Sequence, residues 1–288
     1  MLQDFKSKND SHMKWLALDI DGTLTADKYS CPKETVLFLQ ESQKKGWEVF
    51  VLTGRTASFA MRALNQFDFP FYLSAQNGSI VIEKPGDKVI AREYLSKDAL
   101  QTVIPAVKDV GADFLVYAGF EKGDFCFYEK EHLSSDAVKY TFELQQREKE
   151  PWKDFSELNQ EAFPLIKCFG TLDKMQVLQD KLSSFSKYHL FLVKDPFWEG
   201  IYLLQITSSK ASKGTALKAL IQKKGKGVII AAGDDQNDLP LLEAADCKIA
   251  MEKAPDSLKE KADFIASSPE KEGIVPTLKK AMSKYEKS

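Results

Sequence analysis

Short apolar runs that stop abruptly at polar or glycine-containing turns are the feature that most restricts how this sequence can fold. Three such runs cover residues 14–18, 47–52 and 227–232, and stretches of helical periodicity lie between the strand-like segments. A chain that alternates strand and helix in this way forms a parallel sheet with helices on both faces. We therefore predict a doubly wound, Rossmann-like α/β core whose ligand site lies at the carboxyl ends of the strands.

The alternation of strands and helices is interrupted in the middle of the chain. The interruption opens with the turn-forming run Lys84-Pro85-Gly86-Asp87 and contains a charged helical stretch at 137–149 and several short apolar runs. We interpret residues 84–206 as an inserted α+β cap domain. Residues 1–83 and 207–288 then form the core, which the insertion splits.

The charge balance and the lack of long apolar runs narrow the possible partners. Forty basic and forty-two acidic residues leave a net charge of -2, which gives no field for nucleic acid or an anionic membrane surface. The sequence contains no apolar run of the roughly 18 residues that a membrane helix needs, and its polar start lacks the apolar region of a signal peptide. The four cysteines are scattered without a C-x-x-C pair, so neither a disulfide framework nor a zinc site is indicated. We expect a cytoplasmic protein that acts on a small molecule. The oligomeric state and the choice between Met1 and Met13 as the translation start stay open.

The first candidate site follows the apolar run at 14–18, where Asp19 and Asp21 precede Gly22 and Thr23. The turn at Gly22 allows both carboxylates and nearby N–H groups to converge on one ligand. One carboxylate could attack phosphorus while the other handles protons. The alternative is a turn that happens to be acidic, since aspartate and glycine both favour turns.

A second acidic cluster, Gly233-Asp234-Asp235-Gln236-Asn237-Asp238, follows the run at 227–232. An oxygen-rich cluster at the carboxyl edge of a sheet suits Mg²⁺, which takes few protein carboxylates and completes its octahedron with water and phosphate oxygens. Asp234 is the best candidate ligand. The alternative is helix capping by Asn237 or Asp238, and the two interpretations can hold for different residues.

Two further segments have the chemistry to bind a phosphate group. Thr53-Gly54-Arg55 ends the run at 47–52 and offers a hydroxyl and an approachable backbone at the start of a helix. Lys213 opens a helix after the insertion, where its ammonium could neutralise phosphate as a point charge. Each signal alone is weak, because most of the basic residues must lie on the solvated surface.

Taken together and in this order, the four segments resemble the four motifs of the haloacid dehalogenase superfamily: Asp19-Ile20-Asp21-Gly22-Thr23-Leu24, Thr53-Gly54-Arg55, Lys213-Gly214 and the cluster at 233–238. The long insertion between the second and third motifs, together with Asn77-Gly78, is similar to the Cof-type branch, which places its α+β cap there. The resemblance therefore implies the same split core that the pattern of strands and helices predicts.

The resemblance also implies a role for each matching residue. Asp19 would be the nucleophile and a magnesium ligand, and Asp21 would be the general acid and base and give the metal its backbone carbonyl. Asp234 would ligate the metal, and Asp238 would support these ligands from behind. The phosphoryl group would be held by four residues: Thr53, Gly54, Lys213 and Asn237.

The implied activity is a Mg²⁺-dependent phosphatase that hydrolyses a small phosphorylated metabolite, such as a sugar phosphate or a related monoester, through an aspartyl-phosphate. A phosphomutase or phosphotransferase on the same site and a non-catalytic protein that binds a phospholigand are the alternatives. The sequence does not identify the substrate. It departs from the branch at Asp235 and at two segments, Glu252-Lys253-Ala254 and Pro269-Glu270-Lys271-Glu272-Gly273, positions that the resemblance places at the rim of the site and behind its ligands.

Overall fold

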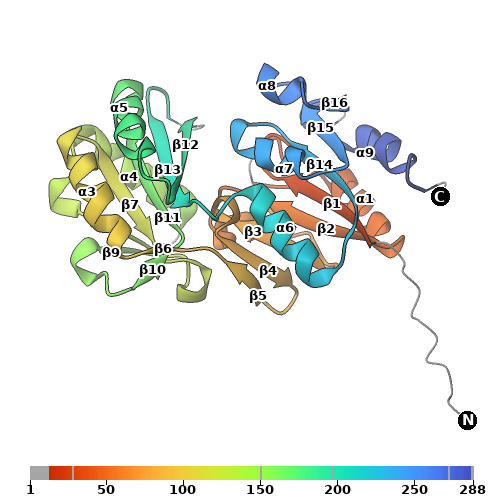
Figure 1. The fold of residues 1–288 in the computed structure, drawn as a ribbon, viewed down its shortest axis with the longest axis horizontal. Helices are drawn as coiled ribbons and strands as arrows, with labels where there is room; N and C mark the ends of the chain where they lie inside the picture. Colours follow the sequence, from red (N-terminus) through yellow and green to blue (C-terminus); the bar gives the residue numbers. More distant parts are fainter. Residues whose placement is uncertain (1–12, 28, 150, 196–197, 272, 287–288) are drawn as a thin grey trace, which may run out of the picture.

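The computed structural model describes residues 13–286 except 28, 150, 196, 197 and 272, so Met1, the rest of the first twelve residues and Glu272 lie outside it. The described chain forms two bodies side by side, each built on its own sheet (Figure 1). The core holds both ends of the described chain, and the cap is inserted between them. Within the described residues, no helix combines the length and the apolar character that crossing a membrane requires.

The core contains an eight-stranded sheet in the order β16-β15-β14-β1-β2-β3-β4-β5. Neighbouring strands from β16 to β3 run parallel, and β4 runs antiparallel to both β3 and β5. The strands are β1 (Met13–Asp19), β2 (Trp47–Leu52), β3 (Phe71–Ala75), β4 (Ile80–Lys84), β5 (Lys88–Arg92), β14 (Gly227–Gly233), β15 (Cys247–Met251) and β16 (Phe264–Ala266).

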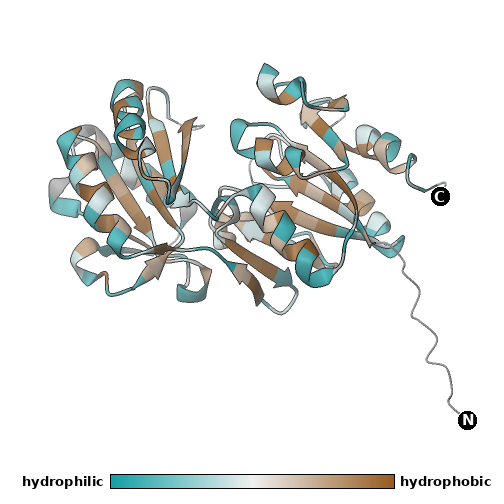
Figure 2. Cartoon of the chain, viewed as in Figure 1, coloured by the Kyte–Doolittle hydropathy of each residue, from teal (hydrophilic) through white to brown (hydrophobic). Residues whose placement is uncertain are grey.

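Helices cover both faces of this sheet because its central strands are apolar on both sides (Figure 2). Leu16 and Leu18 of β1 pack in one core cluster, whereas Trp15 and Ala17 pack in another on the opposite face. The first face carries α1 (Lys33–Lys44), α2 (Ala57–Ala63) and α9 (Val275–Met282), and the second carries α6 (Lys213–Lys224), α7 (Leu239–Glu243) and α8 (Asp256–Lys259). This confirms the predicted doubly wound α/β core.

The cap is built on a six-stranded sheet in the order β12-β13-β11-β7-β8-β9 and a two-stranded sheet of β10 and β6. Its strands are β6 (Leu95–Ser96), β7 (Asp113–Tyr117), β8 (Cys126–Tyr128), β9 (Trp152–Asp154), β10 (Ala162–Phe163), β11 (Leu165–Gly170), β12 (Tyr188–Lys194) and β13 (Tyr202–Ser208). Helices α3 (Asp98–Asp109) and α5 (Leu172–Ser183) pack on one face, and α4 (Ser135–Glu148) packs on part of the other. The 3₁₀ helices of the chain are η1 (Gln76–Gly78), η2 (Phe120–Lys122), η3 (Lys130–His132), η4 (Phe155–Glu157) and η5 (Gln236–Asp238).

The pairing of the strands favours a later boundary between core and cap than the sequence suggested. The expected start of the cap at residue 84 falls inside a hairpin, because β5 pairs antiparallel with β4 as the edge strand of the core sheet. The turn-forming run at 84–87 joins these two paired strands and does not link two domains. At the other end, β13 belongs to the cap sheet up to Ser208. We therefore propose that the cap spans residues 93–208.

Candidate active site

The carboxyl ends of three adjacent parallel strands bring the candidate motifs together. β1 lies between β2 and β14, with Asp19 opposite Leu52 and Leu18 opposite Ala232. The loops that leave these strands therefore begin side by side, although they are separated by up to about two hundred residues in the sequence. Asp19, Thr53 and the cluster at 233–238 meet at this edge.

Lys213 joins two of these loops through its side chain. Its Nζ lies 2.6 Å from Asp19 Oδ1 and 2.5 Å from Asp238 Oδ1, and the lysine side chain is 1% exposed. Helix α6 begins at this residue because Ser212 and Thr215 form a capping box that fixes its start. Burial would lower the pKa of Lys213, but the adjacent carboxylates of Asp19 and Asp238 outweigh it and raise that pKa. The lysine is therefore held as a cation at the centre of the site.

Asp238 has both carboxylate oxygens engaged by the protein. While Oδ1 accepts from Lys213, Oδ2 accepts from the backbone N–H groups of Asp234 and Asp235 at 3.0 and 3.2 Å. This carboxylate is fully buried and fixes the loop that carries Asp234. Asp238 thus supports the loop and Lys213 at the same time. It also forms the capping box of η5 together with Asp235.

Asp19 and Asp234 offer the oxygens that best fit a divalent cation. Asp19 Oδ2 is buried and has no hydrogen-bond partner among the residues that the structure describes. One oxygen from each of Asp19, Asp234 and Asp238 lies within 4.8 Å of the others. Burial raises the pKa of Asp19 to about 8 although the Lys213 ammonium opposes the rise. Burial, together with the charge of Asp19, raises the pKa of Asp234 to about 9. Crowded carboxylates of this kind fit Mg²⁺, whose charge favours their ionised forms.

The turn at Gly22 provides the space that the Asp234 carboxylate occupies. Gly22 has a φ of +72°, and a Cβ built on it would lie 2.0 Å from Asp234 Oδ2. A side chain at this position would therefore overlap the carboxylate and strain the backbone. The sequence pattern identified the turn, but not the close approach of a strand end more than two hundred residues away.

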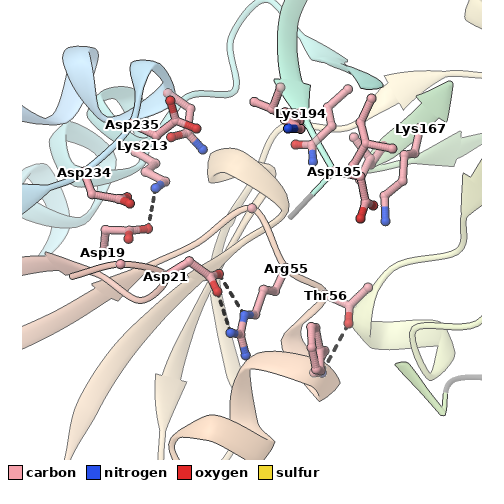
Figure 3. A pocket seen from close by; sticks show the side chains of 18 of the residues that line it. Asp19, Asp21, Arg55, Thr56, Lys167, Lys194, Asp195, Lys213, Asp234 and Asp235 are labelled. Atoms are coloured by element: carbon pink, nitrogen blue, oxygen red, sulfur yellow. Dashed lines mark hydrogen bonds and ion pairs between the residues drawn. The ribbon is translucent and has the colours of Figure 1, made fainter. Parts of the chain in front are cut away.

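Asp21 does not point at this acidic cluster. Its carboxylate accepts two hydrogen bonds from Arg55, at 2.8 Å from Nε and 2.6 Å from Nη2 (Figure 3). The Arg55 guanidinium is nearly buried and lies over the ring of Phe59, with 4.4 Å between Cζ and the ring centroid. Arg55 directly follows Thr53-Gly54 in the sequence, where the pattern alone indicates no contact with Asp21.

The structure places the four residues expected to bind phosphate on the same edge of the core. Thr53 is fully buried, its Oγ1 accepts from the Arg55 backbone N–H at 3.1 Å, and Gly54 lines the cavity beside it. Lys213 and Asn237 line the cavity from the other loops. Asn237 Nδ2 donates to Asn77 Oδ1 at 3.0 Å. The sequence singled out Asn77-Gly78 only as part of the resemblance to the Cof-type branch and predicted no contact for the Asn77 side chain.

A cavity of about 360 Å³ separates these core residues from the cap. Figure 3 shows Lys167, Lys194 and Asp195 across the cavity from the core aspartates. None of these cap residues was singled out from the sequence. The signal available was a polar residue inside an apolar strand, as at Lys167 in β11 and Gln205 in β13. The cap residues that line the cavity are Tyr117, Arg147, Leu165, Lys167, Val193, Lys194, Asp195, Leu203 and Gln205.

Two of the departures from the Cof-type pattern contact each other. Lys253 Nζ lies 3.1 Å from Glu270 Oε1, and Lys271 Nζ lies 2.8 Å from Glu252 Oε1. Glu270 also lines the rim of the cavity. The two altered segments therefore contact each other through two ion pairs.

A family model, curated relatives and solved structures match this chain over most of its length. A family model described as haloacid dehalogenase-like hydrolase matches residues 16–278. The 5-amino-6-(5-phospho-D-ribitylamino)uracil phosphatase YwtE of Bacillus subtilis is 28% identical over 91% of this chain and 96% of the relative. The phosphoglycolate phosphatase of Methanobrevibacter smithii is 24% identical over 92% of this chain and 97% of the relative. Among solved structures, the phosphatase BT1666 of Bacteroides thetaiotaomicron superposes with a TM-score of 0.76 at 20% identity, over 96% of this chain and 98% of that one. The subclass IIB sugar phosphatase BT4131 gives a TM-score of 0.72 at 20% identity, over 93% of this chain and 98% of that one.

Proposed function

This chain belongs to the haloacid dehalogenase-like hydrolases, and we propose that within this family it is a Mg²⁺-dependent phosphatase that works through an aspartyl-phosphate on Asp19. It is a phosphoric monoester hydrolase, in keeping with its relatives, which are named phosphatases. Three parts of this function are proposed: the Mg²⁺ ion, the covalent aspartyl-phosphate and the substrate. The observation that carries the proposal is the buried Asp19 carboxylate: one oxygen accepts from Lys213, the other has no hydrogen-bond partner among the described residues, and an oxygen of Asp234 lies within 4.8 Å of this carboxylate.

Asp19 and Asp234, with the backbone carbonyl of Asp21, would hold the metal. The Mg²⁺ ion supplies positive charge that offsets repulsion between the carboxylates and the phosphoryl group. Lys213 adds a second, permanent positive charge at the same place. Phosphoryl transfer depends mainly on such positioning and charge neutralisation.

The phosphoryl group would be bound from three sides by groups that can donate hydrogen bonds. Gly54, Lys213 and Asn237 line the cavity, and Thr53 lies buried directly before Gly54. Asn237 Nδ2 has two hydrogens, so it can bond to Asn77 and to a phosphoryl oxygen together.

The reaction then proceeds in two balanced steps. In the first, an Asp19 oxygen forms a bond to phosphorus, the ester bond breaks and protonated Asp21 gives its proton to the leaving oxygen. In the second, Asp21 takes a proton from water as that water attacks phosphorus, which releases phosphate and restores Asp19. Arg55 holds the Asp21 side chain through two hydrogen bonds and so positions it for both proton transfers.

We propose that the substrate is a small phosphorylated metabolite held in the cavity between core and cap. Its size agrees with the volume of that cavity, about 360 Å³. The names of the relatives include a ribitylaminouracil phosphate, phosphoglycolate and sugar phosphates as substrates. The feature that these substrates share is the phosphomonoester group. They therefore support phosphomonoester hydrolysis as the reaction and do not identify the leaving group.

The test is phosphate release by the full chain from a panel of phosphomonoesters, with MgCl₂ and with EDTA. We expect turnover that requires Mg²⁺ and is lost in Asp19→Asn. Asp109→Asn is the matched control, because Asp109 lies in an exposed ion pair with Lys181 on the cap. Borohydride reduction during turnover should convert residue 19 to homoserine, which mass spectrometry detects. Turnover that survives Asp19→Asn would rule the proposal out, and an isomerised phosphoester without free phosphate would indicate a mutase.

A further inference from the structure

We propose that Gln205 is a specificity-determining residue, which presents an N–H donor to the leaving group and is oriented by a chain of side-chain amides that starts at Asn237. The inference rests on the proposed phosphatase function and narrows its substrate class. It predicts a phosphomonoester with a hydrogen-bond acceptor, such as a carbonyl or carboxylate oxygen, close to the ester oxygen.

The amide chain crosses from the core to the cap. Asn237 Nδ2 donates to Asn77 Oδ1, and Asn77 Nδ2 donates to Gln205 Oε1. Each amide has one end that donates and one that accepts, so the first bond sets the direction of the second. Gln205 accepts this hydrogen bond through Oε1, so the Nε2 of Gln205 points away from Asn77. Because Gln205 lines the cavity and Asn77 does not, Nε2 is the end available to a ligand.

Asn77 is held rigidly enough to impose this direction. It is fully buried, and its backbone N–H donates to Thr53 O at 3.0 Å. Gln76, Asn77 and Gly78 have φ values of 51°, 55° and 94°, so the loop adopts a left-handed conformation over three successive residues. Asparagine is one of the few residues with a side chain that tolerates this conformation. The loop thus places an amide between the phosphate site and the cap.

The neighbouring strand supports a ligand that accepts hydrogen bonds. Lys167 of β11 lies directly opposite Gln205 of β13, so both side chains project from the same face of the cap sheet. The Lys167 ammonium, which donates to the Tyr117 hydroxyl at 2.6 Å, also lines the cavity and has donors only. The Asp195 carboxylate nearby accepts from the Tyr140 hydroxyl and the Trp198 backbone N–H, which assigns it to holding its loop.

The experiment compares three phosphomonoesters that share the reacting group. Phosphoglycolate carries an acceptor next to the ester, propyl phosphate carries neither donor nor acceptor there, and 2-aminoethyl phosphate carries a donor. For the wild-type chain with Mg²⁺ we expect kcat/KM to fall in that order, by about 2- to 10-fold for each neutral hydrogen bond and more where a charge takes part. Ratios between substrates cancel any change common to all three.

Two variants should reverse the order. Gln205→Glu keeps an oxygen for Asn77 Nδ2 but presents a carboxylate to the cavity, which repels phosphoglycolate and attracts 2-aminoethyl phosphate. Asn77→Asp has no donor, so Gln205 must rotate its amide, donate to residue 77 and present Oε1 to the cavity. Gln101→Glu, on the exposed side of α3, adds the same charge to the cap and should keep the wild-type order.

Each result bears on the proposal. Thermal unfolding checks that the variants are folded, and Asn77→Asp preserves a residue type suited to positive φ. A wild-type chain without preference for the acceptor, or variants that keep the wild-type order, would overturn the role of Gln205 while hydrolysis itself persists. No hydrolysis of any phosphomonoester by the wild-type chain would instead remove the proposed function and this inference with it.

Discussion

Arg55 donates two parallel hydrogen bonds to the carboxylate of Asp21, at 2.8 Å from Nε and 2.6 Å from Nη2. The Arg55 guanidinium also lies over the ring of Phe59. The arginine side chain is 5% exposed and the aspartate side chain 39%, so the partner that is fixed is Arg55. The residue proposed as general acid is therefore positioned from the second motif and not from its own loop alone.

Replacing Arg55 by lysine should lower kcat more than it raises KM. Lysine keeps the positive charge but loses the planar fork that fixes both carboxylate oxygens. Proton transfer from a positioned acid accelerates a reaction by about 10²- to 10⁴-fold. We expect Arg55→Lys to lower kcat by roughly 10-fold or more, because part of this acceleration is lost. Steady-state kinetics on one phosphomonoester measures the split between kcat and KM.

Arg92→Lys is the control for this change, because Arg92 forms an exposed ion pair with Glu121 at 2.7 Å. It should behave like the wild-type chain. If Arg55→Lys also matched the wild type, Asp21 would not depend on Arg55 for its position.

Substituting Gly22 by alanine should abolish Mg²⁺ binding. The added Cβ would lie 2.0 Å from Asp234 Oδ2, so the carboxylate must move away from Asp19. The backbone contributes a separate cost of about 1–2 kcal/mol, because the φ of +72° disfavours a side chain. Thermal unfolding with and without MgCl₂ separates the two effects.

Gly46→Ala is a matched control for the backbone cost. Gly46 has a φ of +83°, and a Cβ there would meet nothing within 4 Å. It should lose stability to a similar extent and still be stabilised by Mg²⁺. A Mg²⁺ response in Gly22→Ala equal to that of Gly46→Ala would contradict the role of Asp234.

The strands that carry the candidate site could be predicted from the sequence because the pattern that marks each of them is local. Apolar runs bounded by turns predicted β1, β2 and β14, and parallel strands bring their ends to one edge, so Asp19 and the loop at 233–238 could be expected to meet. The resemblance to the family then predicted a place for Lys213.

The contacts that the sequence did not reveal depend on tertiary placement. The sequence at 84–87 fits a domain linker and a hairpin turn equally well. The antiparallel pairing of β4 with β5 shows that it forms a hairpin turn. Side chains that meet between the core and the cap, such as Asn77 and Gln205, leave no periodic signal. The ion pair of Glu252 with Lys271 joins two segments that looked like separate departures from the pattern.

Replacing Lys213 by methionine should destabilise the metal-free chain by about 3–5 kcal/mol, because it leaves the buried carboxylates of Asp19 and Asp238 without their cation. Adding Asp238→Asn to this variant removes a buried carboxylate that has lost its cation, so the double variant should lose less than the sum of the single changes. Urea unfolding in EDTA measures all four chains. Strict additivity would mean that the two side chains do not form one unit.

The stabilisation by Mg²⁺ should grow as the pH rises. Burial raises the pKa of Asp19 to about 8, and burial with the charge of Asp19 raises that of Asp234 to about 9, whereas both lie near 3.8 when unperturbed. Above pH 4 the unfolded chain has therefore lost protons that the folded, metal-free chain still binds. The stability contributed by these protons is present below pH 4 and is lost as the pH rises through 8 to 9.

Mg²⁺ binds the ionised carboxylates, so it replaces the protons and its stabilising effect increases over the same pH range. The measurement is the Tm difference with and without MgCl₂ between pH 6 and 9, and Asp234→Asn should flatten its rise. A Tm difference that is independent of pH in the wild-type chain would show that these two carboxyl groups are not the metal ligands.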